Sequence, residues 1–120
     1  MTPTIFPTCT HGKDDPERAT LPYVVGNVAA SAGQAVTVLL TIDGVWTATE
    51  GYADEIHEKG FQPLREVIAS FVSNGGEIWA CGACTAPRGI TEGDLIDGAK
   101  IVTAATVVEV VTEGAVPISF

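Results

Sequence analysis

The chain has 120 residues, enough for one domain with its own hydrophobic core, and we expect a single domain over residues 1–120. Its 15 acidic and 6 basic residues give a formal net charge of -9, which repels phosphate backbones and argues against nucleic-acid binding. Neither a membrane-spanning apolar run nor a signal peptide is evident, so we expect a cytoplasmic protein without membrane contact. The apolar fraction of 46% predicts that other subunits cover part of the surface.

The first elements predicted along the chain are a short strand and a long helix. Residues 4–8 favour a strand, and Asp15 followed by Pro16 is typical of a helix N-terminus. Pro22 disfavours a helix interior, so the helix either kinks there or begins later with Thr20 as its cap. One helical face is predicted from the apolar spacing, with Leu21, Val24, Val25, Val28, Ala29 and Ala32.

The middle of the chain predicts a buried strand, a long loop and a second helix. Residues 35–41 form a near-continuous apolar run that is typical of a strand buried on both faces. Residues 45–60 show no clear period, and a loop of this length is usually functional or interfacial. Pro63 begins a second helix. Its predicted buried face contains Leu64, Val67, Ile68, Phe71 and Val72.

The last third of the chain continues the alternation of strands and helices. Residues 78–80 favour a third strand, residues 91–96 a capping box with a short helix, and residues 100–102 a fourth strand. Residues 103–112 fit a strand by their Val and Thr content and a helix by their spacing, and we choose a helix. Residues 116–120 are the last strand.

This alternation predicts a three-layer α/β/α domain with a mostly parallel five-stranded sheet. Pro117 confines the last strand to a sheet edge or makes it the strand start. The first three strands should end at the same edge of the sheet. The segment after Cys9, residues 45–60 and the segment after Cys81 should therefore converge there, where open α/β sheets gather their chemistry.

Cys81 is the principal candidate for reactivity, because an apolar strand delivers it to a Gly-rich turn with Cys84 three residues later. Such a pair can supply a nucleophile or sulfur carrier, a redox disulfide, or half of a zinc site. Sulfur transfer requires the thiolate, and a free cysteine with a pKa of about 8.5 is mostly protonated at neutral pH. Backbone N–H groups at Gly82 and the guanidinium of Arg88 are the candidates that would stabilise a thiolate here.

Cys9 and His11 are secondary candidates, because the first strand should bring them to the same sheet edge. Cys9 either faces Cys81 across this edge or is a buried apolar residue. His11 is either a proton donor, a partner of a thiolate, or a solvated loop histidine. Together with Cys81 and Cys84 they would make a Cys₃His zinc site, but the two pairs lack the tight paired spacing of zinc signatures. We expect no metal, and no organic cofactor, since no P-loop or dinucleotide fingerprint is present.

Four segments in order carry a resemblance to a known family. They are residues 15–20, residues 42–46, residues 78–81 with Arg88-Gly89-Ile90, and residues 95–99 before the fourth strand. In these motifs the chain resembles the DsrE/DsrF-like (YchN-like, TusD-related) family of small sulfur-relay proteins. The resemblance covers nearly the whole chain and implies a DsrE-like fold.

The resemblance implies that Cys81 carries a persulfide and passes its sulfur to a cysteine of a partner protein, as a persulfide-type sulfurtransferase. It also implies a homotrimer or homohexamer that meets sulfur-donor and sulfur-acceptor proteins. Cys84 is not part of the TusD pattern; it either resolves the persulfide, protects Cys81 by reversible oxidation, or is passive. Two rival functions are a thiol–disulfide redox protein or sensor using Cys81 and Cys84, and a non-enzymatic oligomeric binding module with or without zinc.

Overall fold

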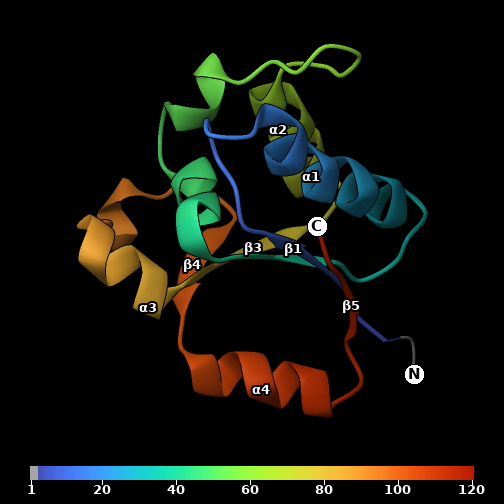
Figure 1. Cartoon of the computed structure of the whole chain (residues 1–120). Coiled ribbons are helices and arrows are strands. Elements are labelled where there is room, and N and C mark those ends of the chain that lie inside the picture. Colours follow the sequence, from blue (N-terminus) through green and yellow to red (C-terminus); the bar gives the residue numbers. More distant parts are fainter. Residues whose placement is uncertain (1–2) are drawn as a thin grey trace.

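A computed structural model describes residues 3–120 and has a five-stranded sheet at its centre (Figure 1). The strand order is β4-β3-β2-β1-β5, and every neighbouring pair is parallel. The strands are β1 (Ile5–Cys9), β2 (Thr37–Leu40), β3 (Glu77–Cys81), β4 (Ala99–Val102) and β5 (Val116–Ile118). The predicted α/β class is confirmed, and the sheet is wholly parallel.

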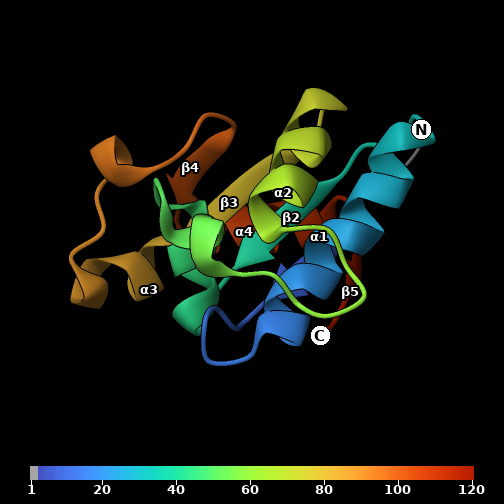
Figure 2. The same ribbon diagram turned by 90° about the horizontal axis from the view of Figure 1, so that it is seen from above.

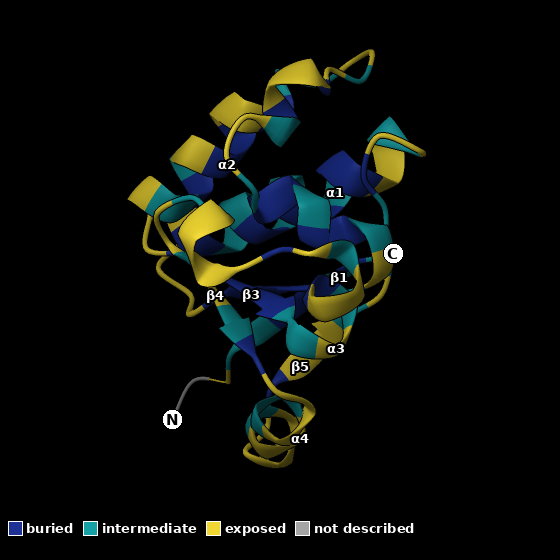
Figure 3. Cartoon of the chain, turned by 90° about the vertical axis from the view of Figure 1, so that its left-hand side faces the viewer, coloured by how far each residue is buried: buried dark blue, intermediate teal, exposed yellow. Residues whose placement is uncertain are grey.

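Helices cover both faces of the sheet, as the three-layer prediction requires (Figures 1 and 3). Helices α1 (Pro16–Ser31) and α2 (Leu64–Ser73) lie side by side on one face (Figure 2), and α4 (Ala104–Thr112) lies on the other. The larger hydrophobic cluster fills the space beneath α1 and α2. A smaller cluster beneath α4 contains Phe6, Leu39, Trp79, Val102 and Ala115. No helix within residues 3–120 is both long and apolar enough to cross a membrane.

Helix α1 begins where the sequence indicates but buries a different face. The Asp15 side chain caps it by accepting the Arg18 N–H at 3.1 Å, and the helix continues through Pro22, so a later start is wrong. The predicted buried face is also wrong, since Val28 is 67% exposed. The buried side is lined by Ala19, Thr20, Pro22, Tyr23, Gly26 and Ala30.

The cause of this rotation is the position of small and polar-tipped residues on α1. A Cβ at Gly26 would lie 3.1 Å from the Phe71 ring, so this side of the helix approaches α2 and the sheet closely. The Tyr23 hydroxyl is buried and pairs with the Thr47 hydroxyl at 2.8 Å. Tertiary packing therefore overrides the valine spacing, because α1 is apolar on several sides.

The predictions for α2 and α4 are confirmed. Helix α2 follows Pro63 and buries Leu64, Val67, Ile68 and Phe71, whereas the fifth residue of the predicted face, Val72, is half-buried. Residues Ala104–Thr112 are helical, and the Thr103 side chain accepts the Thr106 N–H at 3.4 Å as an N-cap. Strand β5 pairs only with β1 among the described residues, which places it at the edge that Pro117 indicates.

The segment after Arg88 differs from its prediction. The capping box between Thr91 and Asp94 is present, but the helix it begins is a 3₁₀ helix, η4, that ends at Asp94. The predicted helix through Ile96 is wrong, because Leu95 bridges Thr49 and the Ile96 N–H donates to the Ala48 carbonyl at 2.8 Å. These backbone bonds tie the segment to the long loop after β2.

That long loop is mostly structured. It contains two 3₁₀ helices, η1 (Ile42–Ala48) and η2 (Tyr52–Glu55), and it buries Val45 and Ile56. Trp46 and Tyr52 stack on each other with ring centroids 6.0 Å apart. The loop therefore packs as a cap over the carboxyl edge of the sheet.

Candidate functional site

The carboxyl ends of β1, β2 and β3 lie next to one another, as the strand alternation predicted (Figure 1). Cys9 is level with Leu40, and Leu40 is level with Ala80, so Cys81 is the next residue along this edge. Helix η1 begins directly after β2, and the short helix α3 (Gly82–Thr85) begins directly after β3. These two turns form the candidate site.

Cys81 occupies the last position of β3 and the N-cap position of α3, without a capping hydrogen bond from its side chain. It is half-buried and free of any disulfide. The following residue, Gly82, leaves little room for a side chain, because a Cβ there would lie 3.2 Å from the Val102 carbonyl oxygen. Glycine therefore allows the turn after Cys81 to sit against the end of β4.

Cys84 faces η1 and is held there by a backbone contact. The Ile42 N–H donates to the Cys84 Sγ, with the nitrogen and sulfur 3.1 Å apart. Ile42 has a φ of 54°, and no other non-glycine residue within residues 3–120 has a positive φ. A β-branched residue rarely adopts this conformation, so the turn is strained where it meets the sulfur. Sequence reasoning missed this donor.

Arg88 connects α3 to η1 through three hydrogen bonds. Its Nε and Nη2 donate to Asp43 Oδ1 at 3.1 and 2.9 Å, and its Nη1 donates to the Cys84 carbonyl at 3.1 Å. The guanidinium is a quarter exposed in this ion pair. These bonds hold the backbone around Cys84 in place, and they engage the carboxylate and the carbonyl rather than either sulfur.

Cys9 lies in the hydrophobic core beneath the site. Its side chain is fully buried, and burial raises the pKa of the thiol to about 12, against a weaker lowering effect of the backbone hydrogen bond to His11. Gly44 of η1 packs directly on the Cys9 backbone, where a Cβ would meet the carbonyl oxygen. The structure thus places Cys9 beside the site but as a protonated core thiol.

His11 is a third exposed and pairs with a carboxylate rather than with a thiol. Its Nδ1 lies 2.7 Å from Asp14 Oδ2. The hydrogen bond from His11, followed by one from the Gly12 N–H, lowers the pKa of Asp14. Within residues 3–120, no hydrogen bond or ion pair connects His11 with Cys81 or Cys84.

A metal centre does not form at this edge in the described part of the chain. No three side chains of the His, Cys, Asp and Glu types in residues 3–120 are arranged to hold a metal ion. The Cys₃His arrangement considered from the sequence is therefore not assembled, because Cys9 lies in the core and His11 turns to Asp14.

An open pocket of about 450 Å³ adjoins the Arg88 side of the site. Trp46, Glu50, Arg88 and Ile90 contribute to its wall. Trp46 stacks on Tyr52, whose hydroxyl accepts the Lys13 N–H at 2.8 Å. None of the three cysteines lines this pocket.

Comparisons with known proteins identify the family. The chain is 28% identical over 102 residues to MJ0760 of Methanocaldococcus jannaschii, covering 85% of this chain but only 37% of that protein. It is 31% identical over 98 residues to MK0008 of Methanopyrus kandleri, covering 81% of this chain and 77% of that protein. The fold matches YchN of E. coli, with a TM-score of 0.80, 18% identity and full coverage of both chains. It also matches MTH1491 of Methanobacterium thermoautotrophicum, with a TM-score of 0.73, 19% identity and full coverage of both chains. The model of the DsrE/DsrF-like family matches residues 4–120, and the chain therefore belongs to that family.

Proposed function

We propose that this protein is a cytoplasmic sulfur carrier that holds sulfane sulfur as a persulfide on Cys81 and transfers it to a cysteine of a partner protein. The DsrE/DsrF-like family is associated with sulfur relay. The observation that carries the proposal is the position of Cys81, half-buried at the carboxyl end of β3 with Cys84 in the next turn. A carrier thiol must be reachable by two protein partners in succession, and Cys81 is not fully buried.

The transfer is a pair of thiol exchanges. The Cys81 thiolate attacks the outer sulfur of a donor persulfide, a new S–S bond forms on Cys81, and the donor thiolate leaves with the electron pair of the broken S–S bond. An acceptor thiolate then attacks the outer sulfur on Cys81, and the Cys81 thiolate is the leaving group. No external oxidant or reductant enters either step.

Cys84 allows a second reaction at the site. A Cys84 thiolate that attacks the inner sulfur of the Cys81 persulfide forms a Cys81–Cys84 disulfide and releases hydrosulfide. The Ile42 N–H and the contacts of Arg88 hold the Cys84 segment in a defined position near the turn. We assign Cys84 the resolving role. After this reaction, Cys81 can accept sulfur again only when another thiol has reduced the Cys81–Cys84 disulfide.

Mass spectrometry after incubation with a polysulfide tests the carrier function. We expect the Cys81 peptide to gain one or more sulfur atoms, and Cys81→Ser to abolish the gain. The adduct should last longer in Cys84→Ser, because hydrosulfide release needs the second thiol. Cys9→Ser is the control, because it replaces a buried thiol that we expect to be unreactive. Sulfur retained on the Cys81→Ser protein at the wild-type level would contradict the proposal.

A thiol–disulfide redox protein is the second candidate function, favoured by the presence of two half-buried thiols within one short turn. This function needs no sulfur donor. It predicts a loss of two hydrogens from the peptide containing both thiols under mild oxidation, with a defined reduction potential in glutathione buffers. If polysulfide treatment yields only this disulfide and no sulfur adduct even in Cys84→Ser, the redox function replaces the carrier function.

We also propose that the protein acts as a homo-oligomer, a homotrimer or homohexamer, in contact with sulfur-donor and sulfur-acceptor proteins. Support comes from apolar side chains on the outer layer of the sheet. Val108 and Val111 of α4 are 61% and 44% exposed, and Val116 of β5 is 44% exposed. A second copy that covers them would account for the high apolar fraction of so acidic a chain.

A further inference from the structure

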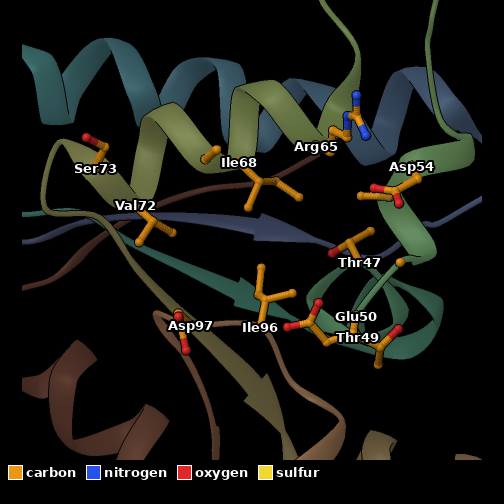
Figure 4. A pocket seen from close by; sticks show the side chains of 13 residues that line it. Thr47, Thr49, Glu50, Asp54, Arg65, Ile68, Val72, Ser73, Ile96 and Asp97 are labelled. Atoms are coloured by element: carbon orange, nitrogen blue, oxygen red, sulfur yellow. The ribbon is translucent and has the colours of Figure 1, made fainter.

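A second cavity in the described chain lies away from the thiols. It is a groove of about 570 Å³ between α2 on one side and the η1–η2 segment with residues 96–97 on the other (Figure 4). This volume is within the usual range of small-molecule sites. None of the three cysteines lines the groove, so the sulfur chemistry does not account for it.

The middle of the groove is apolar. Ile68 and Val72 project from α2, and Ile96 projects toward them from the opposite wall (Figure 4). Ile68 is buried, whereas Ile96 and Val72 are half-buried. An aliphatic chain lying between these walls would remove their exposed apolar surface from water.

Charged side chains mark the two ends of the groove. Asp97 lies at one end, and Asp54 lies beside Arg65 at the other, with Glu50 below them (Figure 4). None of these four side chains takes part in an ion pair or side-chain hydrogen bond within residues 3–120. Three carboxylates against one guanidinium leave a negative charge at each end.

We propose that this groove binds a linear aliphatic diamine or polyamine, with one ammonium group at Asp97, the other at Glu50 and Asp54, and the methylene chain over Ile68 and Ile96. A charge at each end and an apolar middle match this class of molecule and no single-ended one. Dicarboxylates and phosphates would meet carboxylates at both ends, and a neutral chain would leave those carboxylates without counter-charges.

Titration of the isotope-labelled full chain with diaminohexane, followed by amide NMR, tests this site. We expect shifts at Ile68, Val72 and Ile96, and weaker binding of hexylamine, which has one charge. Hexanediol and adipate should leave these amides unshifted. Asp97→Asn should weaken diaminohexane binding about threefold, since an exposed ion pair contributes well under 1 kcal/mol.

The matched control is Glu109→Gln on α4, which removes the same charge from an exposed position outside the groove. It should leave the diaminohexane affinity unchanged, and Glu50→Gln should lower it as Asp97→Asn does. The amide spectrum of each variant verifies its fold. Cys81→Ser should bind the diamine normally, which separates this site from the sulfur chemistry.

Three results would overturn the site. One is shifts spread over the acidic surface with equal affinity in Asp97→Asn and Glu109→Gln, which means non-specific cation attraction. Another is equal affinity for hexylamine and diaminohexane, which removes the two-ended recognition. The third is the absence of any shift at the groove amides, which means that the groove is closed in solution or filled by another copy of the chain.

Discussion

At the scale of single residues, burial gives the three thiols different chemistry. Cys81 and Cys84 are half-buried at the sheet edge, whereas Cys9 is fully buried at the end of β1, two strands away from β3. Burial in apolar surroundings disfavours the thiolate, so Cys9 cannot supply the nucleophile at neutral pH. The sequence pattern places all three cysteines at one edge of the sheet. It cannot distinguish the half-buried thiols from the fully buried one, because the exposure of each sulfur depends on which elements pack above it.

The raised pKa of Cys9 predicts a loss of stability at alkaline pH. The thiol ionises near pH 9.0 in the unfolded chain and near pH 12 in the folded chain. Between these values the unfolded state binds fewer protons, so the free energy of unfolding falls as pH rises, by at most about 1.4 kcal/mol per pH unit. Cys9→Ala lacks this contribution. Its stability deficit at pH 8, about 1 kcal/mol for the lost packing, should shrink above pH 9 in urea unfolding.

Val38→Ala is the control for the Cys9 experiment, because Val38 is equally buried but does not titrate. Its deficit relative to the wild type should stay constant over the same pH range. The buried Tyr23, whose pKa burial raises well above 10.0, contributes to the alkaline slope of all three proteins. Parallel stability curves for the wild type and Cys9→Ala would contradict the assignment of a buried, protonated thiol.

The strained turn at Ile42 predicts a stabilising substitution. A positive φ is unfavourable for a β-branched residue and has no steric cost for glycine, while the Ile42 side chain is already 55% exposed. Ile42→Gly should raise the free energy of unfolding by about 1 kcal/mol while keeping the N–H that donates to Cys84. Val28→Gly, at an exposed helical position of α1, should lower the free energy of unfolding by about 0.4 kcal/mol, the difference in helix propensity.

Chemical denaturation of the two glycine variants under identical conditions measures this contrast. Equal destabilisation by both substitutions would mean that Ile42 is not strained in solution, and that the turn after β2 adopts another conformation. The sulfur adduct of Ile42→Gly can also be measured in the polysulfide experiment. That measurement tests whether the site still accepts sulfur when the backbone contact to Cys84 forms without strain.

The sequence indicated the residues of the candidate site better than their contacts. A strand followed by Cys-x-x-Cys and a nearby arginine is a local pattern, and the structure brings Cys84 and Arg88 together through the Cys84 carbonyl. The Ile42 N–H and the Asp43 carboxylate come from another strand end, 42 and 45 residues away in sequence. Hydrophobic periodicity within one segment does not report a contact between segments so far apart in sequence.

At the scale of elements, the spacing of apolar residues predicts the buried face of a helix where only one face is apolar. Helix α2 buries the stripe that its spacing predicts. Helix α1 has valines on several sides, so spacing cannot select a face, and the position of Gly26 decides the packing. The helix predicted through Ile96 failed for a related reason, because its backbone bonds with the η1–η2 segment outweigh local helix signals.

Gly44 predicts how tightly η1 is joined to β1. A Cβ at this position would lie 2.1 Å from the Cys9 carbonyl oxygen, which is backbone and cannot move aside cheaply. Gly44→Ala should therefore lower the free energy of unfolding by about 3 kcal/mol, as overpacking in a well-packed core does. Gly93→Ala is the matched control, because its Cβ would meet only Thr91 Oγ1 at 3.8 Å, and it should cost less than 1 kcal/mol.

Thermal or urea unfolding of the two alanine variants distinguishes a tight junction from a loose one. If Gly44→Ala is as stable as Gly93→Ala, the η1 turn can move away from β1, and the donor at Ile42 is then not fixed relative to Cys84. The expected large difference would support a rigid site, in which the two turns after β2 and β3 act as one unit.

At the scale of the whole molecule, the two faces of the sheet are covered unequally. Helices α1 and α2 enclose the larger core, whereas α4 alone covers the smaller cluster and has no buried residue of its own (Figure 3). The Trp79 Nε1 within that cluster is buried without a hydrogen-bond partner among the described residues. This layer is therefore the one on which we propose that a second copy of the chain packs.

A charge placed on the outer face of α4 should break the proposed oligomer. Val108 is 61% exposed, and a glutamate there would place a charge, next to Glu109, in any interface that α4 forms. Light scattering coupled to size exclusion should show an oligomer for the wild type and a smaller species for Val108→Glu. Val28→Glu adds the same charge to the equally exposed outer side of α1 and should leave the oligomer intact.

The polysulfide assay on Val108→Glu then separates assembly from chemistry. Cys81 and its turn lie on one chain, at the carboxyl edge of the sheet rather than on the outer face of α4, so a dissociated but folded variant should still accept sulfur. Dissociation by Val28→Glu with an intact Val108→Glu oligomer would place the interface on the α1 layer instead. Loss of sulfur acceptance together with the oligomer, in a variant with native circular dichroism, would mean that a neighbouring copy completes the site around Cys81.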